Sequence, residues 1–112
     1  MGLGYHMFNI REIEIFDVKR LLENGQKAVR LIDVRSPMEV AAGIIPGATN
    51  IPLHMLPMSV DSIPDDSDVV IYCRTGARSA QACAYLTSLG KSNVYNLRGG
   101  IMAWLQGGLA VA

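Results

Sequence analysis

The sequence predicts a three-layer α/β fold, in which a central, mainly parallel sheet of about five short strands carries helices on both faces. Apolar runs of strand length, rich in β-branched residues, occur at 29–34 and 69–72. Segments with helix start and stop signals lie between these runs and their neighbours. Strands that alternate with helices need crossover connections, which place consecutive strands parallel to one another.

The first elements follow from alternation and from capping residues. An imperfect alternation of apolar and charged residues predicts a short edge strand over 10–13. Asp17 is suited to cap the helix that follows, and Asn24 with Gly25 is its stop signal. The apolar run at 29–34 then predicts a buried strand.

A second helix is predicted by a capping box. Ser36 and Glu39 have the required spacing, and Pro37 occupies the first helical position between them. Gly43 ends this helix after little more than one turn. A loop then leads to a brief strand at about 50–51.

The centre of the chain combines a turn-rich segment with the most apolar strand. A single helical turn is predicted at 53–57, and the polar, acidic stretch at 59–67 contains a turn. The central strand at 69–72 follows. The helix after it stops at Gly90, and the last strand is predicted at 93–97.

The chain closes with a helix. The glycine pair at 99–100 predicts a tight turn that lets the helix at 101–106 pack closely. Trp104 on this helix is expected in the core, or as a wall of a nearby site. We expect residues 1–8 to form a flexible leader and 9–112 a single domain, because 112 residues bury one core but not two.

The composition excludes several classes of protein. The formal net charge is zero and there is no basic run, so we expect no nucleic-acid partner. No apolar stretch is long enough to cross a bilayer, and the N-terminus lacks the pattern of a signal peptide. We therefore expect no membrane contact, and the cytoplasm as the compartment. The two cysteines have no histidine nearby, so we predict no metal site.

Cys73 stands where the central strand gives way to a small polar loop, ahead of a predicted helix. Open α/β sheets bind ligands at the carboxyl ends of their strands, and a helix N-terminus favours an anion. Free thiols ionise near pH ~8.5, so a nucleophilic cysteine needs a stabilised thiolate. The position of Cys73 offers that stabilisation, and we predict that it is a thiolate nucleophile.

The residues after Cys73 are suited to an anionic substrate. Two arginines offer fixed positive charge, and a glycine lets successive backbone amides converge on an anion. Two hydroxyl groups add donors, and that of Ser79 is also suited to cap the next helix. The predicted substrate-binding residues are Arg74, Thr75, Gly76, Ala77, Arg78 and Ser79.

Other polar residues are less directly tied to this chemistry. Cys83 lies among alanines on an apolar helix, so we expect it to pack in the core rather than to form a disulfide. His54 is expected to be a partly exposed loop residue. Asp33 and Arg35 either line the site or support it. The favoured reading is structural, with Asp33 accepting loop N–H bonds and Arg35 pairing with Glu39 or a carbonyl group.

Taken together, these segments resemble rhodanese-like sulfurtransferases of the stand-alone, single-domain kind. The match extends from about residue 9 through nearly the whole chain. One departure is Ile44, where the family usually has a histidine that is not catalytic. The four matching blocks, in order, are 31–35 with Glu39, 43–52, the active-site loop at 73–79, and 97–104.

The resemblance implies a two-step transfer of sulfur. Cys73 attacks the outer sulfur of thiosulfate or a similar donor, releases sulfite and becomes a persulfide held by the loop amides. Cyanide or a thiol then accepts the sulfur, in ping-pong order. Arg74 and Arg78 bind the small anionic donor. The resemblance implies no metal and no organic cofactor, and it allows a protein as sulfur acceptor.

Two alternatives remain open at this point. A related fold occurs in cysteine-dependent phosphatases and arsenate reductases, whose loop places five residues between the cysteine and an arginine. Here four residues separate Cys73 from Arg78, Ser79 takes the place of that arginine, and Tyr72 stands where histidine is usual. The second alternative is a dedicated module that carries sulfur between proteins, for which the chemistry at Cys73 would be the same.

Overall fold

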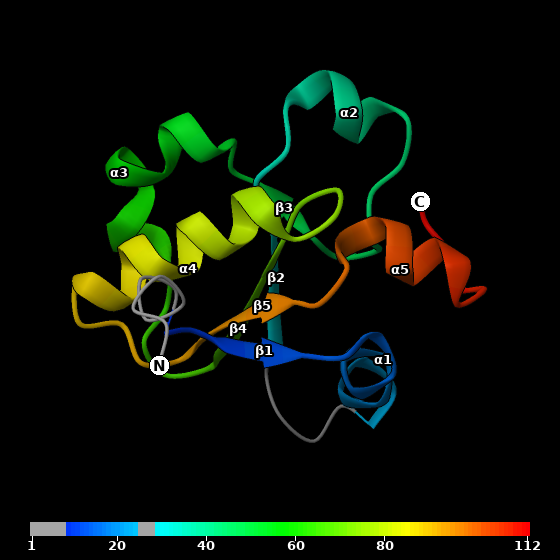
Figure 1. Cartoon of the computed structure of the whole chain (residues 1–112), viewed down its shortest axis with the longest axis horizontal. Coiled ribbons are helices and arrows are strands. Elements are labelled where there is room, and N and C mark those ends of the chain that lie inside the picture. The colour runs from blue at the N-terminus through cyan, green and yellow to red at the C-terminus, as the bar shows by residue number, and fades with distance from the viewer. Residues whose placement is uncertain (1–8, 25–28) are drawn as a thin grey trace, which may run out of the picture.

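The computed structural model describes residues 9–24 and 29–112. Within these residues, five strands form one sheet in the order β1-β5-β4-β2-β3, and each neighbouring pair is parallel (Figure 1). The predicted leader at 1–8 and the helix stop at Gly25 lie outside the described part of the chain. The strands are β1 (Arg11–Ile13), β2 (Val29–Asp33), β3 (Thr49–Asn50), β4 (Asp68–Tyr72) and β5 (Val94–Leu97).

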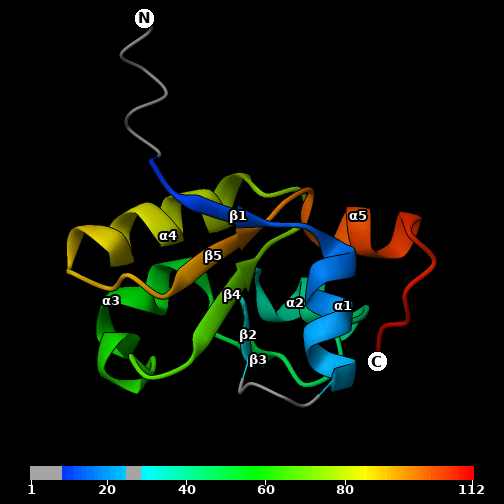
Figure 2. The same cartoon turned by 90° about the horizontal axis from the view of Figure 1, so that it is seen from below.

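Helices cover both faces of this sheet, as the sequence predicts. Figure 2 shows α3 and α4 together on one side, and α1 and α5 on the other. The helices are α1 (Ile15–Asn24), α2 (Pro37–Ala41), α3 (Leu56–Ser59), α4 (Ala77–Ser88) and α5 (Gly100–Gln106). The predicted α/β architecture is therefore confirmed, and the strands described are all parallel rather than only mainly so.

Alternation along the central strand divides the core into two layers. Val69 and Ile71 face the helices α3 and α4, and they pack with a cluster that includes Cys83. Val70 and Tyr72 point to the opposite face, where α1 and α5 pack. Each residue of β4 between Val69 and Tyr72 is fully buried, which explains why this strand is apolar on both sides.

Several element boundaries differ from the prediction. Helix α1 begins at Ile15, and Asp17 lies within its first turn rather than at its cap, because the Glu14 carbonyl already accepts the N–H of Asp17 at 3.1 Å. Strand β3 begins one residue earlier than predicted, at Thr49. The single turn predicted at 53–57 extends through α3 and a 3-10 turn that ends at Ser62.

Other local predictions are confirmed. The capping box of α2 is complete, since Ser36 accepts the N–H of Glu39 and the Glu39 carboxylate accepts the N–H of Ser36. Strand β1 lies at an edge of the sheet. Trp104 is buried in the core, and its indole N–H donates to the carbonyl of Ala110 at 2.9 Å.

The order of the strands creates a switch point between β2 and β4. The chain leaves β4 toward β5 and leaves β2 toward β3, on opposite sides. Asp33 and Tyr72 are partners at the carboxyl ends of these two adjacent strands. The residues that follow each strand, Arg35 and Cys73 among them, therefore meet at one edge of the sheet, where doubly wound folds bind ligands.

The last helix packs against the segment that follows β4. Gly100 has φ = +62°, and a Cβ atom at this position would lie 2.5 Å from the carbonyl oxygens of both Cys73 and Arg74. The backbone N–H groups of Ile101 and Met102 donate to these same two carbonyl groups, at 2.9 and 3.0 Å. The predicted close packing of the turn at 99–100 is therefore confirmed, and Gly100 is what permits it.

We expect Gly100→Ala to lower the free energy of unfolding by about 4 kcal/mol, because a left-handed conformation and a backbone clash both oppose the new methyl group. Denaturant unfolding followed by circular dichroism measures this loss. Gly108→Ala is the matched control, since its φ is +79° and nothing lies within 4 Å of the added Cβ. It should cost only about 1 to 2 kcal/mol. Equal losses in the two variants would contradict the close approach at Gly100.

Candidate active site

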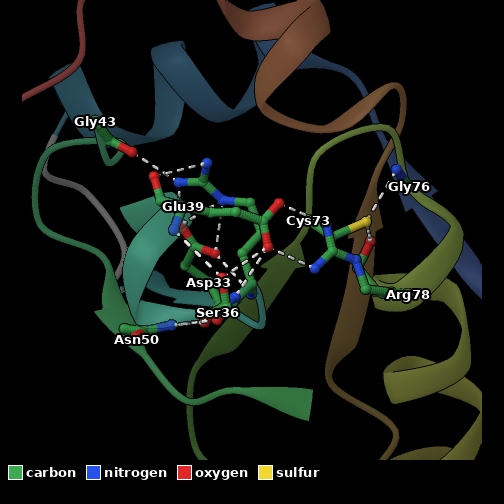
Figure 3. A network of polar contacts seen from close by, with 10 residues as sticks. Asp33, Ser36, Glu39, Gly43, Asn50, Cys73, Gly76 and Arg78 are labelled. Atoms are coloured by element: carbon green, nitrogen blue, oxygen red, sulfur yellow. Dashed lines mark hydrogen bonds and ion pairs between the residues drawn. The ribbon is translucent and has the colours of Figure 1, made fainter. Parts of the chain in front are cut away.

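Cys73 is the first residue after β4, and its side chain is only 1% exposed. We call residues 73–79 the Cys73 loop. Its sulfur accepts the backbone N–H of Gly76 at 3.1 Å and the hydroxyl of Ser79 at 3.3 Å (Figure 3). Gly76 has φ = +110° and is the N-terminal cap of α4. This left-handed backbone turns the loop amides toward the sulfur, as the sequence predicts.

The surroundings of Cys73 favour its thiolate. Burial raises the pKa of the thiol, but hydrogen bonds from the Ser79 hydroxyl and from the amides of Ser79, Gly76 and Thr75 outweigh this effect. The net result is a pKa below the ordinary value for cysteine. A thiolate at the end of β4 is the form that can act as a nucleophile.

Ser79 does not cap the helix, because it lies inside the first turn of α4 and Gly76 holds the cap position. Its hydroxyl lies 2.5 Å from Oδ1 of Asn96 as well as 3.3 Å from the sulfur. A hydroxyl has one proton, so the sulfur of Cys73 and Asn96 share a single donor.

Asn96 was not among the site residues predicted from the sequence. This residue is buried on β5, and its Nδ2 donates to the carbonyl of Gly76 and to the carboxylate of Glu12, both at 3.2 Å. Asn96 therefore fixes the position of the Cys73 loop from the buried side, through the Gly76 carbonyl. A polar residue inside an otherwise apolar strand was the available signal, since buried amides require partners.

Arg78 is paired with a carboxylate. Its two terminal nitrogens donate to the two carboxylate oxygens of Glu39, both at 2.8 Å. This contact is the main reason that the pKa of Glu39 falls to about 2 and that the pKa of Arg78 rises. The sequence predicted Arg78 as a ligand for the donor but did not predict this partner, which comes from a segment 39 residues away.

The rest of the loop faces solvent. The side chains of Arg74, Thr75 and Ala77 are exposed. Among the residues that the structure describes, the Arg74 side chain has no ion pair, so its charge is available to a ligand. Ala77 begins α4 and supplies no polar side chain.

Asp33 and Arg35 form a buried ion pair beneath the site. The Arg35 guanidinium donates to both oxygens of Asp33 and, at 2.7 Å, to the carbonyl of Gly43. Asp33 also accepts the backbone N–H of Arg35 at 2.9 Å. Asn50 donates to the carbonyl groups of both residues, at 2.9 Å. These contacts match the structural alternative, because Asp33 accepts a loop N–H and Arg35 donates to a carbonyl group. The ion pair between Asp33 and Arg35 was not predicted.

Cys83 lies in the core and both cysteines are free, as predicted. Burial raises the pKa of Cys83 to about 12, so its thiol stays protonated. His54 is exposed, and it lines a shallow hollow beside Arg78 whose other walls are mainly apolar. The remaining lining residues are Val34, Ser36, Pro37, Pro52 and Leu53.

In 9–24 and 29–112, no group of three or more histidine, cysteine, aspartate or glutamate side chains is placed to hold a metal ion. None of the helices in this part of the chain has the length and apolar character needed to cross a membrane.

Comparison with known proteins identifies relatives over most of the chain. A sulfurtransferase from Allochromatium vinosum is 55% identical over 102 residues, which cover 91% of this chain and 94% of that protein. A thiosulfate:glutathione sulfurtransferase from Homo sapiens is 33% identical, and the match covers 84% of this chain and 92% of that protein. The crystal structure of a rhodanese-related protein from Thermoplasma volcanium superposes with a TM-score of 0.82 at 31% identity, and covers 91% of this chain and 97% of that chain.

The family model for the rhodanese-like domain matches residues 16–107. This range includes all four blocks on which the sequence resemblance rests. The resemblance is thereby confirmed, and the matched region contains the strands β2 to β5 and the Cys73 loop, whereas β1 precedes it. The protein is a member of the rhodanese-like domain family.

Proposed function

We propose that the protein transfers a sulfane sulfur from a small anionic donor to a thiol or to cyanide, through a persulfide on Cys73. Its relatives support sulfur transfer in general. The observation that carries the proposal is the environment of Cys73, whose buried sulfur accepts hydrogen bonds from Gly76 and Ser79 and has a lowered pKa. A thiolate in a ring of donors is suited to attack sulfur and then to hold a persulfide anion.

The donor step is a nucleophilic displacement at the terminal sulfur of the donor. The thiolate of Cys73 attacks the terminal sulfur of thiosulfate, a new S–S bond forms, and the S–S bond of the donor breaks as sulfite leaves with the electron pair. Arg74 is exposed and attracts the anion, and Arg78 on the first turn of α4 adds a second positive charge. The substrate-binding role of residues 74–79 is part of this proposal.

The acceptor step needs access for a second molecule. The hollow beside Arg78 offers apolar walls together with His54 and Ser36, so it suits an organic thiol better than a small inorganic ion. The relative from Homo sapiens is named for glutathione, which is a thiol of this kind. We propose a low-molecular-weight thiol as the acceptor and the cytoplasm, where thiols stay reduced, as the compartment.

The phosphatase alternative fits this site less well. A phosphoryl group needs a loop whose donors surround three oxygens. Here the sixth residue of the loop after Cys73 is Ser79, which is buried and already bonded to the sulfur and to Asn96. Arg78 is paired with Glu39, and the negative charge of this carboxylate repels a phosphate dianion.

We expect Cys73→Ser to abolish sulfur transfer, because a hydroxyl cannot form a persulfide. Intact-protein mass spectrometry before and after thiosulfate, and again after cyanide, measures the gain and loss of one sulfur atom. Wild-type protein should gain the sulfur and then lose it with release of thiocyanate. A folded, reduced wild-type protein that gains no sulfur from any donor, but hydrolyses an aryl phosphate, would overturn the proposal in favour of the phosphatase.

Cys83→Ser is the matched cysteine variant. It places a hydroxyl in the apolar cluster between the sheet and α4, so it should lower the stability by about 1 to 3 kcal/mol. Sulfur transfer should continue at nearly the wild-type rate, because the Cys83 thiol is protonated and buried. Loss of transfer in a folded Cys83→Ser protein would refute the assignment of roles to the two cysteines.

We expect Ser79→Ala to slow alkylation of Cys73 by iodoacetamide about fivefold to tenfold near neutral pH. The Ser79 hydroxyl lowers the pKa of Cys73, so its removal raises that pKa and reduces the thiolate fraction at any pH below it. The rates of variant and wild type should converge at a pH above both pKa values. Ser88→Ala on the same helix, whose hydroxyl donates to the Tyr85 carbonyl, is the control. A parallel decrease at every pH would indicate lost packing instead.

A further inference from the structure

Glu39 holds one of the two arginines that the sequence predicts as donor-binding groups. Both contacts between its carboxylate and the Arg78 guanidinium are 2.8 Å long (Figure 3). The Oε1 atom of the same carboxylate also accepts the backbone N–H and the hydroxyl of Ser36, both at 3.1 Å. The capping box of α2 therefore fixes the carboxylate in place. If Arg78 turned toward a ligand, Glu39 could not follow it.

The charges of the site nearly cancel. Arg35 is committed to Asp33 in the buried pair, and Arg78 is committed to Glu39. Arg74 is exposed and faces no carboxylate among the described residues. Three guanidinium groups thus stand against two carboxylates and the thiolate of Cys73, so these charges sum to zero. The site offers a donor no excess positive charge, and a dianion brings two uncompensated negative charges where a monoanion brings one.

We propose that Glu39 is a specificity-determining residue, which makes the site discriminate against dianionic sulfur donors in favour of donors with a single negative charge. The inference rests on the proposed sulfur transfer through Cys73 and names its donor class. That class comprises organic thiosulfonates and persulfides with one charge beside the transferable sulfur. Inorganic thiosulfate, a dianion, is then a poorer donor.

The size of the effect follows from the exposure of the pair. Coulomb energy scales with the product of the charges, so a dianion beside Glu39 is repelled twice as strongly as a monoanion in the same place. The Arg78 and Glu39 side chains are 38% and 32% exposed, and solvent at that level screens the repulsion. We therefore expect discrimination of several-fold.

A matched pair of donors separates charge from shape. Methanethiosulfonate carries a methyl group in place of one oxygen of thiosulfate, so it has nearly the same size and one negative charge fewer. With either donor, the thiolate of Cys73 bonds to the terminal sulfur and the S–S bond of the donor breaks. The electron pair leaves on sulfite from thiosulfate, or on methanesulfinate from methanethiosulfonate. The difference in leaving group cancels when the same two donors are compared between two proteins.

The test uses Glu39→Gln, which removes the charge and keeps an oxygen that can accept the N–H of Ser36. The measurement is the second-order rate constant for sulfur transfer to Cys73, followed by intact mass. We expect the constant to rise about tenfold for thiosulfate and about threefold for methanethiosulfonate. The preference for methanethiosulfonate over thiosulfate should thus fall about threefold. Glu39→Ala, which lacks the acceptor, should shift the preference in the same direction.

The control is Glu23→Gln on α1, which changes the net charge equally and removes an exposed pair with Lys19. It should leave the preference unchanged. An unchanged preference in the Glu39 variants, or an equal loss of rate with both donors, would overturn the inference and leave Glu39 as a support for the loop. If neither donor placed sulfur on Cys73 of the wild-type protein, the proposed function would fail instead, and the inference with it.

Discussion

The Cys73 loop depends on the close approach of α5. The N–H groups of Ile101 and Met102 bond the carbonyl groups of Cys73 and Arg74, and the missing side chain of Gly100 leaves room for this contact. Because these carbonyl groups are satisfied by α5, the amides farther along the loop stay directed at the sulfur. A helix that lies outside the Cys73 loop thus determines whether the sulfur of Cys73 is surrounded by donors.

Two ion pairs at the same sheet edge contribute differently to the stability of the fold because their burial differs. The Asp33–Arg35 pair is almost completely buried, and removing one partner from such a pair costs about 3 to 5 kcal/mol. The Glu39–Arg78 pair is partly exposed, and a pair of this kind contributes about 0 to 1 kcal/mol. The first pair therefore joins β2 to the loops around it, whereas the loss of the second would leave the fold nearly as stable.

Sequence reasoning succeeded where the signal is local. Burial on both faces of β4 and the capping box at Ser36 are encoded within a few residues, and so is the donor-rich sequence after Cys73. The bonds from Arg78 to Glu39 and from Ser79 to Asn96 join segments far apart in the chain. Such pairs depend on which strands lie side by side, and several strand orders were compatible with the same alternation of strands and helices. Asp17 and Ser79 were expected to cap helices but lie inside their first turns, because each helix begins at an earlier residue.

The two cysteines show that burial alone does not decide reactivity. Both side chains are buried and both belong to the cluster between the sheet and α4. Burial raises the pKa of each thiol, and for Cys83 this is the main effect. Cys73 differs because hydrogen bonding from the Ser79 hydroxyl and from backbone amides of the loop, which no side-chain substitution removes, outweighs the effect of burial on its pKa. Since those amides are held by backbone geometry, a shift in the loop backbone should disturb the thiolate more than the loss of any single loop side chain.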